Sequence, residues 1–142
     1  MLRLIAALLC VSVLSFTSGD AEAIKLGRIA KAAALIKTYQ TYKKTHPKTG
    51  KVYVGRTSGT NSPIANIKKR DSAHHRSQDG FGRAKIDKTS SNKDAIRGRE
   101  QQEIELHRND GSGADQINGI SPKNPKRQQY LDAANNEFGK SK

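Results

Sequence analysis

Residues 35–57 read LIKTYQTYKKTHPKTGKVYVGRT and set the architecture that we predict for this chain. β-Branched and aromatic residues are frequent in 35–44 and in 51–57, which is typical of strands. Between these runs lies His46-Pro47-Lys48-Thr49-Gly50, in which proline fixes φ and glycine permits a positive φ. Two such runs joined by a short turn predict an antiparallel β-hairpin.

The residues after the hairpin predict a small α+β domain over 38–142. We expect a loop over 58–63, a helix over 63–76 with Pro63 in its first turn, and a third strand over 83–89. Ser91, with Asp94 three residues on, is expected to cap a helix that ends near His107, and a last helix covers about 126–138. The predicted fold is a three-stranded antiparallel sheet flanked by helices, in the order β-β-α-β-α-α.

The first 23 residues have the pattern of a secretory signal peptide. Arg3 precedes an apolar run from Leu4 to Phe16, and small residues follow in Ala21-Glu22-Ala23. The run is too short to span a bilayer as a helix, and the alternative interpretation is a buried N-terminal helix. Residues 24–37 would then be a lead-in segment. We therefore expect a secreted or periplasmic protein whose mature form is not inserted in a membrane.

The charge balance favours a polyanionic partner. Lys and Arg total 26 against 13 Asp and Glu, a formal net charge of +13. An excess of this size favours nucleic acid first and an anionic membrane surface second. A single cysteine in 142 residues excludes a disulfide scaffold. A hydrophobic content of 34% argues against a membrane bundle or a large cofactor enzyme and predicts a thin core.

An ordered set of polar residues follows the predicted elements. Tyr42 lies in Gln40-Thr41-Tyr42, and the second strand contains Tyr53-Val54-Gly55. Arg70 and His74 are four residues apart on the predicted helix, Glu100 lies on the capped helix, and Asn118 follows it. This set resembles the GIY-YIG nuclease superfamily, with only the tyrosine of the GIY motif retained. It is also similar to the GIY-YIG-like domains of bacterial polymorphic toxins. The resemblance covers about 38–125 and is strongest in TGKVYVGRTSG, residues 49–59.

The resemblance implies an exported, metal-dependent endonuclease that hydrolyses DNA with low sequence preference. It implies that Tyr53 activates water with the help of His74, and that Tyr42 supports Tyr53. The other implied roles are phosphate binding by Arg56 and Arg70, coordination of Mg²⁺ or Mn²⁺ by Glu100, and orientation of a backbone segment or of Glu100 by Asn118.

The residue types leave plainer alternatives open. Glu100 lies on the line Ile96–Glu100–Ile104, where a carboxylate is costly unless it is paired or metal-bound. It could instead pair with Arg70 or Arg97, or be exposed. Glu103 could share its face, whereas Glu105 should be solvated. The tyrosines could simply fill the hairpin, Arg70 could be a surface cation, and Asn118 could serve the turn before Gly119. His75 is expected to point away from His74.

The remaining basic residues predict contact with a nucleic-acid backbone. Few aromatic residues accompany them, so contacts to phosphates are expected rather than stacking on bases. The residues we expect to bind nucleic acid are Lys51, Lys68, Lys69, Arg83 and Lys85. Residue types do not distinguish DNA from RNA, so RNA stays open. We expect a monomer, and the likeness to toxin domains makes an immunity protein a candidate partner. The rival functions are an inactive nucleic-acid-binding module on the same fold and a cationic membrane-active protein.

Overall fold

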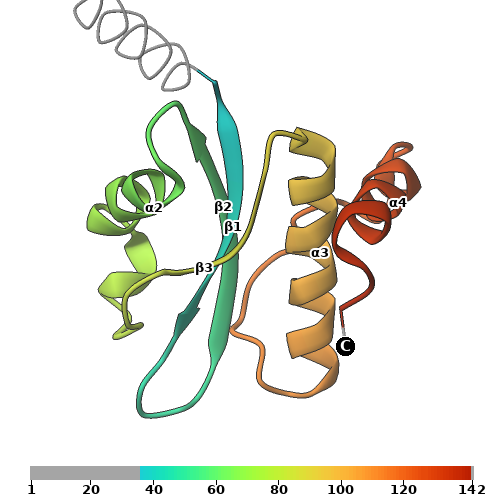
Figure 1. The fold of residues 1–142 in the computed structure, drawn as a ribbon. Coiled ribbons are helices and arrows are strands. Elements are labelled where there is room, and N and C mark those ends of the chain that lie inside the picture. Colours follow the sequence, from blue (N-terminus) through green and yellow to red (C-terminus); the bar gives the residue numbers. More distant parts are fainter. Residues whose placement is uncertain (1–35, 142) are drawn as a thin grey trace, which may run out of the picture. The chain divides into compact units, whose positions relative to one another are not determined.

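The computed structural model describes residues 36–141. The predicted signal peptide and all but the last two residues of the lead-in segment 24–37 therefore lie outside the described residues. The elements are β1 (Thr38–Thr45), β2 (Val52–Gly59), α2 (Pro63–Ser72), η1 (His75–Ser77), β3 (Lys85–Ser90), α3 (Lys93–Asn109) and α4 (Arg127–Phe138). This order confirms the predicted α+β fold (Figure 1). Over the described part of the chain, no helix combines the length and apolar character needed to cross a membrane.

The predicted hairpin is the centre of the sheet. The strand order is β2-β1-β3, and β1 pairs antiparallel with both neighbours. The turn is closed by a hydrogen bond of 2.9 Å from the Gly50 amide to the His46 carbonyl. In the resulting register Tyr42 lies opposite Gly55, and Lys44 lies opposite Tyr53. Both tyrosine motifs are therefore side by side in the sheet.

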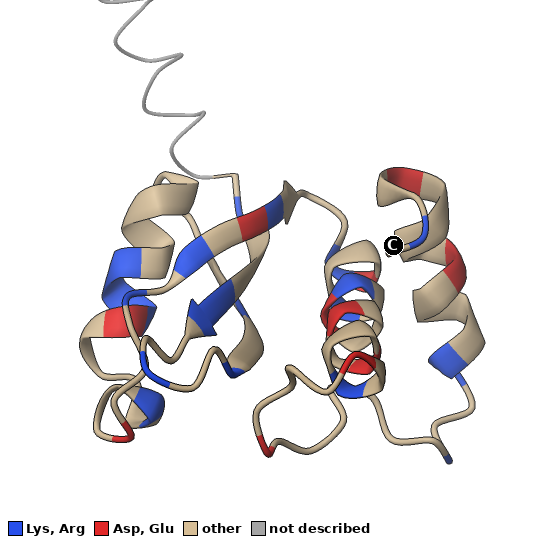
Figure 2. Ribbon diagram, turned by 90° about the horizontal axis from the view of Figure 1, so that it is seen from below, with Lys and Arg blue, Asp and Glu red and all other residues tan. Residues whose placement is uncertain are grey.

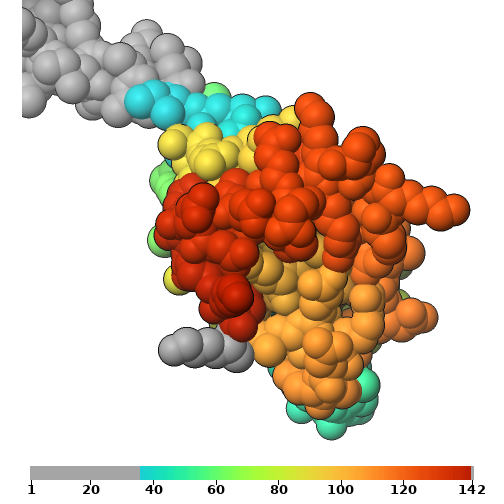
Figure 3. All heavy atoms as spheres, turned by 90° about the vertical axis from the view of Figure 1, so that its right-hand side faces the viewer, coloured from blue at the N-terminus to red at the C-terminus, as the bar shows by residue number. Residues whose placement is uncertain are grey.

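The two faces of the sheet carry different helices. Helix α2 lies on one side, α3 lies on the other, and α4 packs outside α3 (Figure 1). From the side, α4 and the segment leading to it cover part of α3, and the rest of α3 stays visible below them (Figure 3). Because side chains alternate along a strand, Tyr42 faces Arg70 of α2 whereas Lys43 faces Glu103 of α3. The sheet thus separates two polar layers.

The core is thin, as predicted, and much of it is polar. Behind the sheet Val54, Ile96, Ile104 and Ile120 are buried, and charged residues lie next to them. Lys43 and Arg99 form ion pairs of 2.6 and 2.7 Å with Glu103, and Arg99 also pairs with Asp87 at 2.9 Å. Figure 2 shows acidic and basic residues interleaved along α3. On this face of the sheet, a network of ion pairs with balanced charge therefore replaces part of the apolar core.

Three predicted boundaries were wrong. Strand β2 continues to Gly59, so the connection to α2 is three residues shorter than the predicted loop. The N-cap of α3 is Asn92, not Ser91, because the Asn92 side chain accepts hydrogen bonds from the backbone amides of Asp94 and Ala95. Helix α2 ends at Ser72 rather than at 76. The chain leaves the helix there, and the contacts described below hold the residues that follow.

Candidate functional site

Tyr42 lies at the centre of a polar cluster on the α2 face of the sheet. Its side chain is 1% exposed, and its hydroxyl oxygen lies 2.9 Å from His74 Nε2 and 3.3 Å from Arg70 Nε. The ring passes directly over Gly55, where an added Cβ would lie 2.6 Å from the phenol oxygen. The glycine of Tyr53-Val54-Gly55 therefore makes the room that Tyr42 occupies. The structure brings together Tyr42, Arg70 and His74 as the sequence predicted.

The helical position predicted for His74 was wrong. His74 does not share a helical face with Arg70, because it lies beyond the end of α2 and caps the short helix η1. Burial, together with the charges of Lys44 and Arg70, lowers the pKa of His74 to about 4, so the ring is neutral at pH 7. Its Nδ1 accepts the Arg76 amide at 3.1 Å. The proton is therefore assigned to Nε2, which donates to the Tyr42 hydroxyl.

A buried lysine holds the segment that carries His74. Lys44, next but one to Tyr42 on β1, is 1% exposed. Its ammonium group pairs with Asp71 at the end of α2 and donates to Ser77 Oγ at 3.0 Å. These two partners flank His74 in the sequence, so Lys44 ties both ends of the segment to the sheet. Lys44 was among the remaining basic residues expected to contact a nucleic-acid backbone, because nothing in a run of two lysines shows which one is buried; the structure buries it instead.

Tyr53 is the more accessible of the two phenols. Its ring is half-buried and lies edge-on to the rings of His74 and His75, with centroid distances of 5.0 and 5.7 Å. Among residues 36–141 its hydroxyl has no hydrogen-bond partner, so this oxygen can bind water. Burial raises the pKa of Tyr53 and the Glu100 charge adds to the rise, while Arg70 and Arg76 oppose it. The prediction for His75 was wrong, since its ring stacks on His74 at 4.6 Å.

Glu100 is buried on α3 between Ile96 and Ile104, as its spacing predicted. Arg56 Nη1 lies 3.0 Å from its Oε2, so the ion pair is with Arg56 rather than with Arg70 or Arg97. Even so, Oε2 accepts no well-aligned hydrogen bond. Burial raises the pKa of Glu100, although the charges of Arg56 and Arg97 oppose the rise. A buried carboxylate needs a positive partner, and here Arg56 supplies it, so a metal ion that binds Oε2 would have to displace the Arg56 guanidinium.

The charge of Glu100 reaches both tyrosines. Burial raises the pKa of Tyr42 to about 12 against the hydrogen bond from Arg70, and the charge of Glu100 contributes to the rise. The same carboxylate raises the pKa of Tyr53. At pH 7, five units below its pKa, ionising Tyr42 would cost about 7 kcal/mol. Glu100 comes from α3 and the phenols lie on the α2 face of the sheet, so its influence on them is electrostatic and, for Tyr42, smaller than the effects of burial and of Arg70.

The other glutamates of α3 have different surroundings. Glu103 is 1% exposed and is bound by Lys43, Arg99 and Ser141, so it does not share the environment of Glu100. Glu105 pairs with Arg127 nearer the surface. Among residues 36–141 no three His, Cys, Asp or Glu side chains form a group that could hold a metal ion. Protein ligands to a hard cation at this place would thus be limited to Glu100, with water and phosphate oxygens as the others.

Asn118 lies near Glu100 but does not contact its carboxylate. Its Oδ1 accepts a hydrogen bond of 2.7 Å from Arg108. The next residue, Gly119, packs so closely that an added Cβ would lie 2.6 Å from Glu100 Oε2. Asn118 thus fixes the backbone segment that covers Glu100, which is one of the two roles considered for it.

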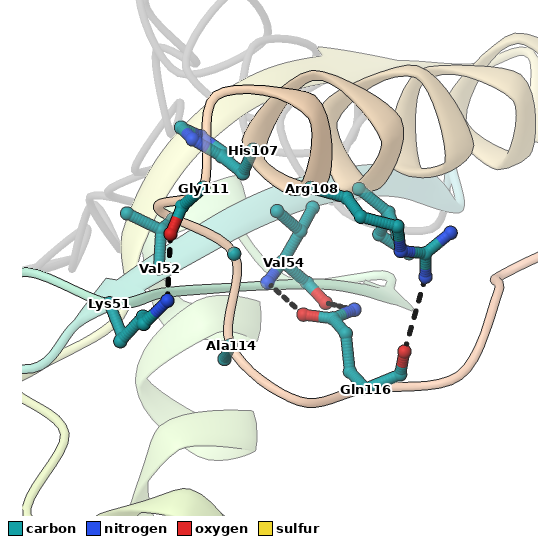
Figure 4. A pocket seen from close by; sticks show the side chains of 10 residues that line it. Lys51, Val52, Val54, His107, Arg108, Gly111, Ala114 and Gln116 are labelled. Carbon is teal, nitrogen blue, oxygen red and sulfur yellow. Dashed lines mark hydrogen bonds between the residues drawn. The ribbon is translucent and has the colours of Figure 1, made fainter.

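A glutamine fastens this segment to the edge of the sheet. Gln116 accepts the Val54 amide at 2.9 Å and donates to the Val54 carbonyl at 3.0 Å, as a neighbouring strand would (Figure 4). Close by, Lys51 donates to the Gly111 carbonyl at 2.7 Å. The side chain of Gln116 therefore covers the exposed edge of β2, a role that sequence analysis missed.

The five cations expected to bind nucleic acid do not gather at this site. Lys51 is held by the loop after α3, and Lys68 and Arg83 line a depression between α2 and the start of β3. Lys69 and Lys85 are exposed on α2 and β3. Binding of nucleic acid by these residues stays a prediction.

No family model, curated protein or solved structure matches the chain. The case for its function therefore depends on the geometry and electrostatics described above.

Proposed function

We propose that residues 38–142 are a GIY-YIG-type endonuclease that hydrolyses phosphodiester bonds of DNA with the help of a divalent cation. The observation that carries the proposal is the convergence of Tyr42, Arg70 and His74 in one hydrogen-bonded cluster within the electrostatic reach of Glu100. A merely structural tyrosine needs one hydrogen-bond partner, whereas Tyr42 has two, His74 at 2.9 Å and Arg70 at 3.3 Å.

Each side chain has a role that its surroundings permit. Tyr53 orients the attacking water with its accessible hydroxyl. His74 uses both ring nitrogens for positioning, so it holds Tyr42 instead of acting on water directly. Arg70 donates to Tyr42 through its Nε, which leaves its terminal nitrogens for the scissile phosphate.

The buried oxygen of Glu100 is the proposed cation site. Mg²⁺ or Mn²⁺ bound there would neutralise charge on the phosphate and on the carboxylate. The negative charge of Glu100 contributes to the raised pKa of both tyrosines, so its neutralisation favours their ionised forms. The fold then supplies positioning and charge stabilisation, which are the main contributions needed for phosphoryl transfer.

The test is a plasmid-nicking assay with Mg²⁺ or Mn²⁺, with and without chelator. We expect the wild type to cleave, and Glu100→Gln to lose at least about a hundredfold in rate. The control is Glu137→Gln, which removes an exposed carboxylate of α4 and should cleave like the wild type. Equal cleavage by the wild type and Glu100→Gln would refute the proposed cation site. Matched duplex RNA in the same assay decides between the two substrates.

One observation favours a second function. The ion pair between Arg56 and Glu100 neutralises the carboxylate without any metal, as a binding module with no catalytic activity would require. Retained binding of DNA with no cleavage in either metal would establish that function instead. Export and a toxic role remain part of the proposal, and the residues that predict export lie outside those described.

A further inference from the structure

A cavity of about 450 Å³ opens beside the candidate site, and its lining is strongly basic. It lies within the volume range of small-molecule binding sites. The charged residues that line it are Lys37, Arg56, Arg70, Lys93 and Arg97, and none of the other lining residues is acidic. Tyr39 adds an aromatic ring, with the Lys37 ammonium 5.6 Å from its centroid.

These cations come from segments that are distant in the sequence. Lys37 precedes β1, Arg56 lies on β2, Arg70 on α2, and Lys93 and Arg97 on α3. Folding therefore gathers five positive charges around one space, which raises their mutual repulsion. Of these five, only Arg56 has a carboxylate partner among residues 36–141, and that partner is Glu100. The Nε of Arg97 is buried without a hydrogen bond.

We propose that this cavity is a binding subsite for backbone phosphates that flank the scissile phosphate. The inference rests on the proposed function, because Arg56 and Arg70 belong to both places. It assigns new residues, Lys37, Lys93 and Arg97, to the strand. A phosphate chain supplies negative charges for the four cations without a carboxylate partner among residues 36–141, and Tyr39 offers a face for a sugar or base.

The choice of residues differs from the one made on sequence. Lys68 and Arg83 line another depression, and Lys51 is held by a backbone carbonyl, whereas Lys37 and Lys93 are exposed at the mouth of a cavity with an unbalanced charge. The strand is therefore expected to follow the gap between β1, the start of α3 and Arg70.

The test measures binding and not cleavage. A fluorescent single-stranded oligonucleotide is titrated with the full chain in chelator over a range of salt concentrations. The variants are Lys37→Glu and Lys93→Glu. The control is Lys140→Glu, which makes the same change of charge at an exposed position that does not line the cavity. Lys93 begins α3, where glutamate is favourable to the helix, so weaker binding cannot be attributed to loss of that helix.

We expect each cavity variant to bind more weakly, with a salt dependence shallower by about 0.7 for each phosphate that is no longer neutralised. Lys140→Glu should keep the slope of the wild type. Unchanged slopes for both cavity variants, or an equal change for Lys140→Glu, would overturn the inference. The two proposals fail separately: cleavage with unaltered slopes refutes the subsite alone, and shallower slopes without cleavage support the subsite and refute the nuclease.

Discussion

Replacement by glutamine should change the stability of the protein by very different amounts at two glutamates that lie three residues apart on α3. Glu103 is 1% exposed and receives Lys43 at 2.6 Å, Arg99 at 2.7 Å and Ser141 at 2.7 Å. Glu103→Gln removes the charge that two cations need. Breaking a buried pair in this way costs about 3 kcal/mol or more, which lowers the melting temperature of a domain of this size by roughly 10 °C.

Glu100→Gln should leave stability within about 1 kcal/mol of the wild type. The ion-pair partner of Glu100 is Arg56, whose side chain is 38% exposed and stays solvated when the pair is lost, whereas the Glu103 partner Arg99 is 10% exposed. Burial also disfavours the charged form of Glu100. The raised pKa of Glu100 also predicts how stability depends on pH. Above pH 4.5 the folded state holds this proton more tightly than the unfolded state, so the contribution of Glu100 to stability falls as pH rises through its folded pKa. Because glutamine does not titrate, the stability of Glu100→Gln should not show this fall as pH rises.

The assay is thermal unfolding of both variants at pH 7 and at pH 5, together with the cleavage rate of each. We expect Glu103→Gln to unfold at a lower temperature than the wild type, and to cleave DNA at temperatures where it stays folded. Glu100→Gln should melt like the wild type and not cleave. If Glu100→Gln melts at as low a temperature as Glu103→Gln, Glu100 is a structural carboxylate and our reasoning from the exposure of its partner Arg56 is wrong.

Three more perturbations test the surroundings of the site. His74 has a pKa of about 4, so the folded state resists its protonation and the protein should lose stability as pH falls from 6.5 to 4; in urea unfolding, His74→Asn should lack this part of the acid sensitivity. Gly55→Ala places a methyl group 2.6 Å from the Tyr42 oxygen, which should cost about 1–3 kcal/mol in urea unfolding and reduce cleavage. An unaltered rate would show that the position of Tyr42 does not matter. Gln116→Ala removes both hydrogen bonds to Val54, so hydrogen exchange at the Val54 amide should accelerate by about tenfold; continued protection would mean that another group covers this edge.

The sheet and the element order could be predicted from local patterns. The turn chemistry of His46 to Gly50 fixes the hairpin, and Pro63 marks the start of α2. The register of β1 on β2 then places Tyr42 beside Gly55. Each of these features depends on residues close together in the sequence, where propensity and periodicity are informative.

The position of His74 could not be predicted in this way. Its spacing from Arg70 fits a continuing helix, but the helix ends at Ser72 and buried contacts decide the path of the chain beyond it. Lys44 binds Asp71 and Ser77, and Tyr42 binds His74. These are tertiary interactions between β1 and a segment about thirty residues on, and they override a weak local preference. His74 was predicted to lie in the site beside Tyr53, but its hydrogen bond with Tyr42 and its place beyond the end of α2 were not predicted.

Charge balance distinguishes the two polar regions of this domain. In the network behind the sheet, Lys43 and Arg99 face Asp87 and Glu103, so the charges compensate and the network serves the fold. The cavity beside Arg70 gathers five cations, with Glu100 the carboxylate that pairs with one of them. Uncompensated charge weakens a folded protein through self-repulsion. The cluster is therefore not explained by the stability of the fold, and this supports the proposal that a polyanion binds there.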